Sequence, residues 1–240
     1  AGTPESPDDL LKASTENNTI IGSSINDTLE SLLKNGQMYE MTMGDVLTSM
    51  SCEYRGYLIP AIGLKGNEIT LIGFYAMDGG LCKGFVPVYG SSGIVHFHTR
   101  TKPAHYNIQF EDMEVALEVD LKSPVIKAEY TDGQVRFHIR LSCVATLLYL
   151  SKETRVTDEM LQKMGEAVKQ DLQKRHMDAV KTSQQIGVDY LDLHETFRIK
   201  YPDIYANIDW SEVYPKAEIN FDTNVLVKWG TVDYKSNESE

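Results

Sequence analysis

Apolar and polar residues alternate along three segments in the second half of the chain. Odd-numbered positions are mostly apolar in Met113–Leu121, Val135–Cys143 and Ala217–Trp229, and the positions between them are mostly polar or charged. A period of two places successive side chains on opposite faces of a strand. The pattern therefore predicts three half-buried strands, and Gly230 ends the last of them.

Helical spacing of apolar residues and flanking capping residues predict five helices, at about 8–14, 24–35, 43–54, 157–185 and 188–200. In the third, Thr42 and Asp45 form a capping arrangement, and Val46, Leu47 and Met50 are expected to be buried. The fifth stops at residue 201, because the proline at 202 disfavours a helical residue before it.

Short strands are expected between the third and fourth helices. Apolar runs at Tyr57–Leu64, Ile69–Met77 and Leu81–Val88 are separated by Lys-Gly-Asn and Asp-Gly-Gly, which are turns that join antiparallel strands. A further strand is expected at Ile94–His98. A polar connector, Thr99–Tyr106, then leads into the second half.

This connector is the expected domain boundary, because it contains a proline and separates two strand patterns. We expect an α+β protein of two domains built on antiparallel sheets with helices packed on one face. The middle domain would cover residues 9–99 and the C-terminal domain residues 107–232. Residues 1–8 and 233–240 are expected to be disordered tails, and the first of them does not look like a signal peptide.

Composition excludes several classes of function. The 240 residues carry a net charge of −12, which argues against binding nucleic acid or an anionic membrane through a basic face. No apolar run approaches the ~20 residues that span a bilayer. Cys52, Cys82 and Cys143 are too few and too scattered for a disulfide framework, so we expect all three to be structural.

The candidate chemistry is a group of histidines. His96 and His98 would share one face of the expected strand, with His105 beyond the connector. No carboxylate accompanies them, and an exposed polar face of an edge strand explains the same residues. The Gly90–Gly93 loop opens no helix and favours a hairpin connection over an anion site. We therefore expect no metal, no cofactor and no catalytic residue, with an enzyme site near His96, His98 and His105 as an alternative.

The last predicted helix has charges that suit its ends. Asp189 at its start can accept the free backbone N–H groups, and Arg198 in its last turn suits the negative end of the helix dipole. Structural roles therefore explain both residues. Trp210 and Trp229 are expected to pack in the core or between domains.

These C-terminal features occur in an uncommon order: Asp189, Phe197-Arg198, Tyr201-Pro202, Trp210 and a strand closing at Trp229-Gly230. The segment TLIGFYAMDGGLCKGFVPVYG adds a strand–turn–strand with an aliphatic-Gly-aromatic strand before its glycine turn. In spacing, from about Leu10 to Gly230, the chain resembles the Ger(x)C family of spore germination proteins. These are the lipoprotein C subunits of germinant receptors.

The resemblance implies the second and third domains of a C subunit. Such a subunit acts beside membrane subunits at the outer face of the spore inner membrane, and its lipid anchor would lie upstream of residue 1. We expect a non-enzymatic role in receptor assembly and germinant response, with no nucleic-acid partner. The candidate partner-binding surface consists of Asp192, Glu195, Arg198 and Tyr201. Besides the enzyme, the other alternative to this role is a module that binds a small-molecule germinant, although the sequence shows no signature of a large apolar pocket.

Overall fold

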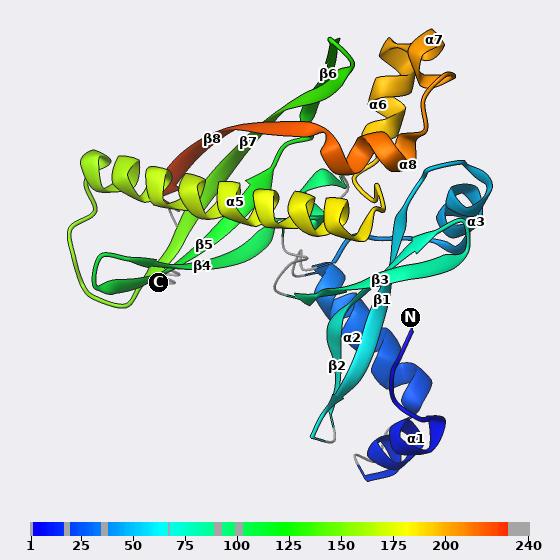
Figure 1. The fold of residues 1–240 in the computed structure, drawn as a ribbon. Coiled ribbons are helices and arrows are strands. Elements are labelled where there is room, and N and C mark those ends of the chain that lie inside the picture. Colours follow the sequence, from blue (N-terminus) through cyan, green and yellow to red (C-terminus); the bar gives the residue numbers. More distant parts are fainter. Residues whose placement is uncertain are drawn as a thin grey trace, which may run out of the picture.

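The computed structural model describes residues 2–16, 20–34, 38–66, 68–88, 93–98 and 103–229. A small sheet lies next to a larger sheet, and one long helix lies across the larger sheet (Figure 1). The predicted α+β fold class is confirmed.

The smaller sheet is the predicted meander. Its strands are β1 (Tyr57–Lys65), β2 (Glu68–Asp78) and β3 (Leu81–Pro87), which pair antiparallel in the order β1-β2-β3. Gly79 and Gly80 form the second turn with φ of 51° and 88°, a conformation that glycine adopts without steric cost.

The larger sheet has five strands, β4 (Ala104–Phe110), β5 (Met113–Leu121), β6 (Val125–Thr131), β7 (Gln134–Leu150) and β8 (Glu218–Trp229). β6 pairs with the first part of β7 and β5 with its last part, both antiparallel. β8 pairs with β7 in parallel, from Arg136↔Glu218 to Leu147↔Trp229. The sheet is therefore antiparallel except along β8. The predicted strand at Val135–Cys143 continues to Leu150, and β4 and β6 are additional strands.

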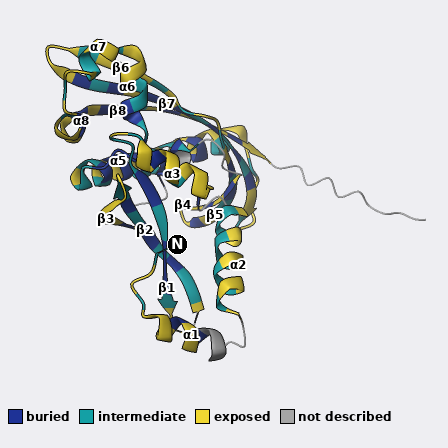
Figure 2. Cartoon of the chain, turned by 90° about the vertical axis from the view of Figure 1, so that its right-hand side faces the viewer, coloured by how far each residue is buried: buried dark blue, intermediate teal, exposed yellow. Residues whose placement is uncertain are grey.

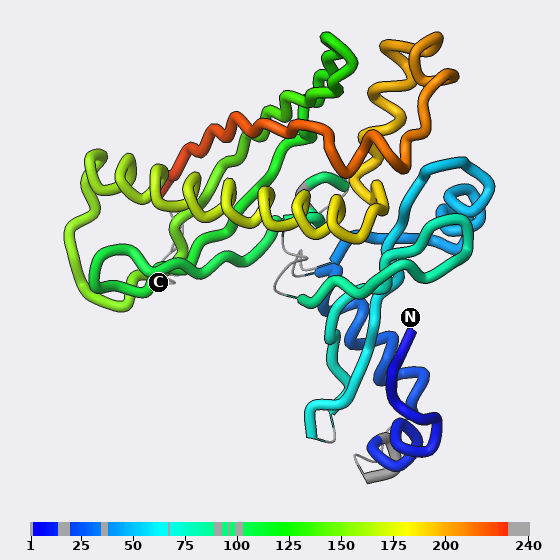
Figure 3. Tube along the Cα trace, in the orientation of Figure 1, coloured from blue at the N-terminus to red at the C-terminus, as the bar shows by residue number. Residues whose placement is uncertain are grey.

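The helices are α1 (Pro7–Glu16), α2 (Ile21–Lys34), α3 (Met43–Ser51), α5 (Asp158–Ile186), α6 (Leu193–Lys200), α7 (Pro202–Tyr205) and α8 (Trp210–Val213), with 3-10 turns η1 (Val95–Phe97) and η2 (Tyr214–Lys216). α5 begins where the Thr157 hydroxyl accepts the Met160 N–H, and it ends at Gly187 with φ of 76°. Figure 3 traces the chain from α5 through α6, α7 and α8 and back along β7 as β8.

Two hydrophobic clusters hold these elements together. One joins α5 to the larger sheet, with Val168 and Leu117 fully buried. The other contains residues of both sheets and of α6 and α8, including Phe74, Phe137 and Trp210. Figure 2 shows α3 largely exposed beside buried central strands. The second cluster therefore contains residues from both halves of the chain, and the division into two domains stays a prediction.

Several expectations about the ends of elements differ from the structure. Ile94–His98 is not a strand: Phe97 N–H donates to the Ile94 carbonyl at 2.9 Å, which closes the η1 turn. A five-residue segment is too short for its alternation to specify a strand. The Thr99–Tyr106 connector overlaps β4, which begins at Ala104. The helix expected from 188 begins only at Leu193, because Asp192 adopts a left-handed conformation with φ of 61°.

Exposure also corrects two expectations. Leu47 and Met50 of α3 are 60% and 46% exposed rather than buried. Trp210 is buried as predicted, whereas Trp229 is 53% exposed because it ends the edge strand β8. At the N-terminus, Gly2 donates to the Pro60 carbonyl at 2.8 Å and α1 starts at residue 7, so part of the expected tail is paired. Positions 90–92 and 233–240 lie outside the described residues.

Candidate functional site

Asp189 organises the turn between α5 and α6. Its carboxylate is buried and accepts hydrogen bonds from Leu193 N–H at 3.1 Å, His194 N–H at 2.7 Å and Trp210 Nε1–H at 3.2 Å. The first two bonds satisfy N–H groups that the start of α6 leaves without a helical partner. The third bond, from the indole of Trp210, connects α8 to the same carboxylate. The structural role predicted for Asp189 is confirmed, although α6 starts five residues later than expected.

The exposed side of α6 carries an ion pair. Arg198 donates through Nε and Nη2 to both carboxylate oxygens of Glu195, at 2.8 and 2.7 Å. Glu195 and Arg198 are 40% and 52% exposed, and this hydrogen bonding lowers the pKa of the Glu195 carboxyl. An exposed i,i+3 pair contributes at most a few tenths of a kcal/mol to folding. The pair is therefore available to a partner at little cost to stability.

The other two residues of the predicted surface are engaged elsewhere. The Tyr201 ring packs against Phe197 at 5.2 Å and Tyr130 at 6.2 Å, so it is half-buried in the aromatic cluster. Asp192 pairs with Arg55, which lies between α3 and β1, and Arg55 Nη2 is 3.4 Å from its carboxylate. Asp192 is 40% exposed, like Glu195, but its partner is Arg55, whereas Glu195 and Arg198 contact each other directly. The four-residue surface stays a prediction.

An apolar stripe on α3 adds to the exposed surface. Met43, Leu47 and Met50 share one helix face by their spacing, and they are 73%, 60% and 46% exposed. The helix packs on the protein through the small side chain of Ser49. A capping box between Thr42 and Asp45 fixes its start. α3 is thus well formed but presents its apolar side to solvent.

A cavity of about 310 Å³ lies between α3, η1 and the turn that precedes α6. Its walls combine aromatic, acidic and basic side chains: Tyr39, Glu40, Met41, Asp45, Ser49, Arg55, Gly56, Tyr57, Phe97, His98, Tyr190, Leu191 and Asp192. We call it the seam cavity, because it joins residues of both halves of the chain. Sequence reasoning missed Tyr39 and Arg55. One feature of the sequence could have drawn attention to Arg55: no other Lys or Arg occurs between Lys34 and Lys65.

Buried polar groups give the seam cavity its character. The His98 ring stacks on Tyr39 with 4.0 Å between centroids. Burial, and secondarily the charge of Arg55, lowers the pKa of His98 to about 4 against an opposing hydrogen bond to the Tyr190 backbone. Burial also raises the pKa of Asp192, while the charge of Arg55 acts in the opposite direction. At neutral pH the cavity therefore holds a neutral imidazole beside an ion pair.

Of the three histidines of the sequence hypothesis, the two with described side chains, His98 and His105, lie in different places. His98 lines the seam cavity, whereas His105 is exposed on β4, opposite Glu118 of β5. The side chain of His96 lies outside the described residues. Within the described ranges, no three His, Cys, Asp or Glu side chains are grouped as metal ligands would be. Cys143 is buried, which raises the pKa of its thiol to about 11.

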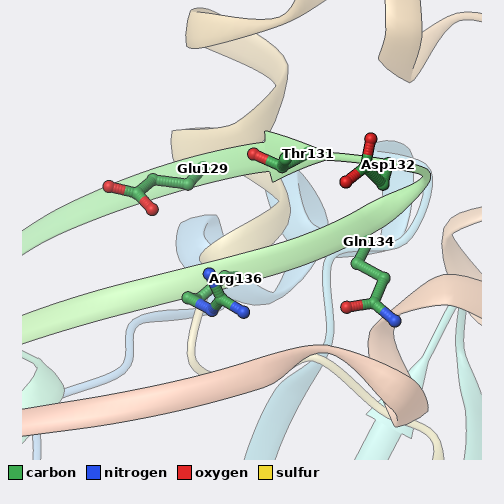
Figure 4. A pocket seen from close by; sticks show the side chains of 5 residues that line it. All are labelled: Glu129, Thr131, Asp132, Gln134 and Arg136. Atoms are coloured by element: carbon green, nitrogen blue, oxygen red, sulfur yellow. The ribbon is translucent and has the colours of Figure 1, made fainter.

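A second hollow, of about 240 Å³, lies at the tip of the β6–β7 hairpin. Figure 4 shows that its side chains, Glu129, Thr131, Asp132, Gln134 and Arg136, are spread along the two strands and the turn and do not converge on one point. Arg136 pairs instead with Glu218 of β8 at 2.7 Å. This hollow is therefore a weaker candidate for ligand binding than the seam cavity.

Comparisons with known proteins identify the family. The family described as "Spore germination B3/ GerAC like, C-terminal" matches residues 78–228, which is more than half of the chain. The crystal structure of the GerBC protein matches with a TM-score of 0.69 at 16% identity, over 79% of this chain and 61% of that chain. At that identity the likeness concerns the fold, and this chain spans about three fifths of GerBC.

No curated protein matches the chain. No helix in the described ranges has both the length and the apolar character of a membrane span. The chain belongs to the Ger(x)C family of spore germination proteins, as its C-terminal residues predict.

Proposed function

We propose that this chain is part of the C subunit of a germinant receptor and acts through contacts with partner subunits rather than by catalysis. Family membership and the GerBC-like fold support the receptor assignment. The observation that carries the interaction role is the apolar face of α3, because a capped helix with exposed Met43, Leu47 and Met50 resembles half of an interface.

The α3 stripe and the α6 ion pair belong to one proposed partner surface. Tyr54, just beyond α3, packs edge-on against Tyr205 of α7 at 6.4 Å. Cys52 also lies close enough to Arg198 to affect the pKa of its guanidinium. The C-terminal end of α3 therefore lies near α6 and α7, which supports joining the stripe and the ion pair in one surface.

The proposed occupant of this surface is a segment of a receptor membrane subunit with apolar residues flanked by Lys or Arg. Glu40, Asp45 and Glu53 flank the stripe, and no basic residue occurs from 35 to 54. This charge favours a basic partner, and it disfavours both an anionic lipid surface and symmetric pairing of two copies. By family resemblance, the subunit would be held at the outer face of the spore inner membrane by a lipid anchor.

The test compares variants in spores. Leu47→Gln and Arg198→Ala should reduce incorporation of the C subunit into the receptor and slow germination. Because both side chains are exposed, each should change the free energy of unfolding by less than about 0.5 kcal/mol. Leu226→Gln is the matched control, since Leu226 is 54% exposed on β8. Equal receptor levels in all three strains would refute the proposed surface. Tyr201 is a poorer test because its ring packs in the aromatic cluster.

The enzyme alternative has little support from the geometry. A His98 with a pKa of about 4 is a weak base at neutral pH. His105 is exposed on β4 and does not line the seam cavity. Receptor assembly is the function that the contacts of these residues favour.

A further inference from the structure

We propose that the seam cavity binds a small ammonium ion that also carries a hydroxyl-type oxygen. The inference rests on the cavity's own polar atoms and charges, and it does not depend on the proposed function. The cavity's volume of about 310 Å³ is at the lower end of the range of small-molecule sites. A compact ligand therefore fits better than a nucleotide or a peptide.

Three buried polar atoms of the cavity wall lack hydrogen-bond partners. They are Tyr39 Oη, His98 Nε2 and Asp192 Oδ1. His194 Nδ1 lies 3.4 Å from Asp192 Oδ1 without hydrogen-bond geometry. A weak backbone hydrogen bond from Leu58 acts on the Tyr39 oxygen and opposes the rise in its pKa, but the Tyr39 O–H itself has no acceptor. Buried polar atoms are almost always paired in folded proteins, so three that share one cavity indicate a missing polar occupant. Tyr39 is only 7% exposed, which makes its hydroxyl costly to leave unpaired.

The chemistry of these atoms selects a hydrogen-bond donor. The bond between His98 and the Tyr190 backbone leaves Nε2 as a bare acceptor, because Nε2 itself has no partner. Asp192 Oδ1 is also an acceptor. An ammonium group offers three N–H donors and no acceptor, and so can serve both atoms. Tyr39 O–H and Arg55 are donors, and they require an acceptor oxygen on the same ligand.

The charges of the wall favour a cation. Glu40, Asp45 and Asp192 contribute three carboxylates against the single guanidinium of Arg55, which already pairs with Asp192. An anionic ligand would add to this negative charge. Tyr57, Phe97 and Tyr190 also line the cavity, and aromatic rings are suited to a cation that is shielded from water.

The experiment compares three molecules of similar size that differ in charge: ethanolamine, ethylene glycol and glycolate. Each is titrated into the full chain of 240 residues at pH 7, and backbone amide shifts are followed by NMR. Ethanolamine should shift the amides of Arg55, Leu191 and Asp192 in a saturable way. Ethylene glycol should bind at least about 10-fold more weakly, because it lacks the charged donor, and glycolate more weakly still.

Variants assign the binding to these atoms. Asp192→Asn should weaken ethanolamine binding about 10-fold or more, and Asn tolerates the left-handed backbone at this position. Tyr39→Phe keeps the stacked ring but removes the hydroxyl, and it should weaken binding about 5-fold. Asp178→Asn, on the exposed side of α5, is the matched control and should bind normally, as should Leu47→Gln of the partner surface.

Three results would overturn the inference. They are glycolate binding as tightly as ethanolamine, equal ethanolamine binding by Asp192→Asn and Asp178→Asn, and no saturable shift up to about 100 mM. The last result would mean that water alone occupies the cavity. Normal binding by Leu47→Gln separates this test from the test of the partner surface.

Discussion

Replacing Asp189 should be among the most damaging single changes to the fold. Its carboxylate joins the turn after α5, the first turn of α6 and the indole of Trp210, and only 4% of the residue is exposed. Asp189→Ala removes three hydrogen bonds to a charged acceptor and leaves three buried N–H donors without partners. We expect a loss of about 3–5 kcal/mol in the free energy of unfolding.

Asp189→Asn keeps the shape of the side chain but changes its charge and its hydrogen bonds, so it separates these contributions to stability. Oδ2 accepts from both His194 N–H and Trp210 Nε1–H, so an amide oxygen in its place keeps two of the three bonds. The amide nitrogen then faces the Leu193 N–H, and two donors oppose each other. The expected loss is about 1–3 kcal/mol, clearly smaller than for alanine.

Urea denaturation followed by far-ultraviolet circular dichroism measures both losses. Asp178→Asn on the exposed side of α5 should lie within about 0.5 kcal/mol of the original chain. If Asp189→Ala were as stable as Asp178→Asn, the carboxylate would not organise this turn. If Asp189→Asn were as unstable as Asp189→Ala, the negative charge rather than the number of bonds would be decisive.

Three further predictions concern pH, metal content and domain organisation. Because the pKa of His98 is lowered from 6.5 to about 4, the unfolded chain binds more protons between these values. The free energy of unfolding should therefore fall by up to about 3 kcal/mol as pH drops from 6.5 to 4. Urea titrations of His98→Gln should show a smaller change with pH, and an unchanged pH dependence in this variant would contradict the prediction. The purified chain should contain no stoichiometric metal; near-equimolar zinc in elemental analysis, lost on changing His96 and His98 to Ala, would refute this. Limited proteolysis should cut first within residues 99–103, before any cut in β5, β7 or α5, whereas early cleavage inside those elements would argue for one continuous domain.

Long periodic segments could be predicted from sequence because many positions agree on which face of the element is buried. In β7, Val135 to Ala145 alternates between buried and more exposed positions, as the apolar pattern predicts. β6 could not be found this way, since Ala128 is its only buried residue and its pairing with β7 defines the strand. η1 was predicted wrongly because three apolar residues in five fit a strand and a buried turn equally well.

The candidate sites also differ in whether the sequence could predict them. Glu195 and Arg198 are three residues apart on one helix, so their pairing follows from helical spacing. Arg55 and Asp192 are 137 residues apart, and no local pattern relates them. The seam cavity depends on such distant contacts, and the sequence therefore indicated the surface of α6 but not the cavity beside it.

α3 and α5 show why amphipathic spacing alone does not predict burial. Both helices have an apolar stripe, but α5 lies across a sheet whose apolar face would otherwise meet water, and it buries Met164, Val168 and Leu172 there. The smaller sheet contributes Leu58 and Phe74 to the core shared by both halves. In α3 the buried residue is Ser49, and no part of the described chain covers the apolar face of this helix. Periodicity thus identifies which residues of a helix form its apolar face. Whether that face is buried depends on whether the fold offers a second apolar surface, such as an uncovered sheet face, for it to pack against.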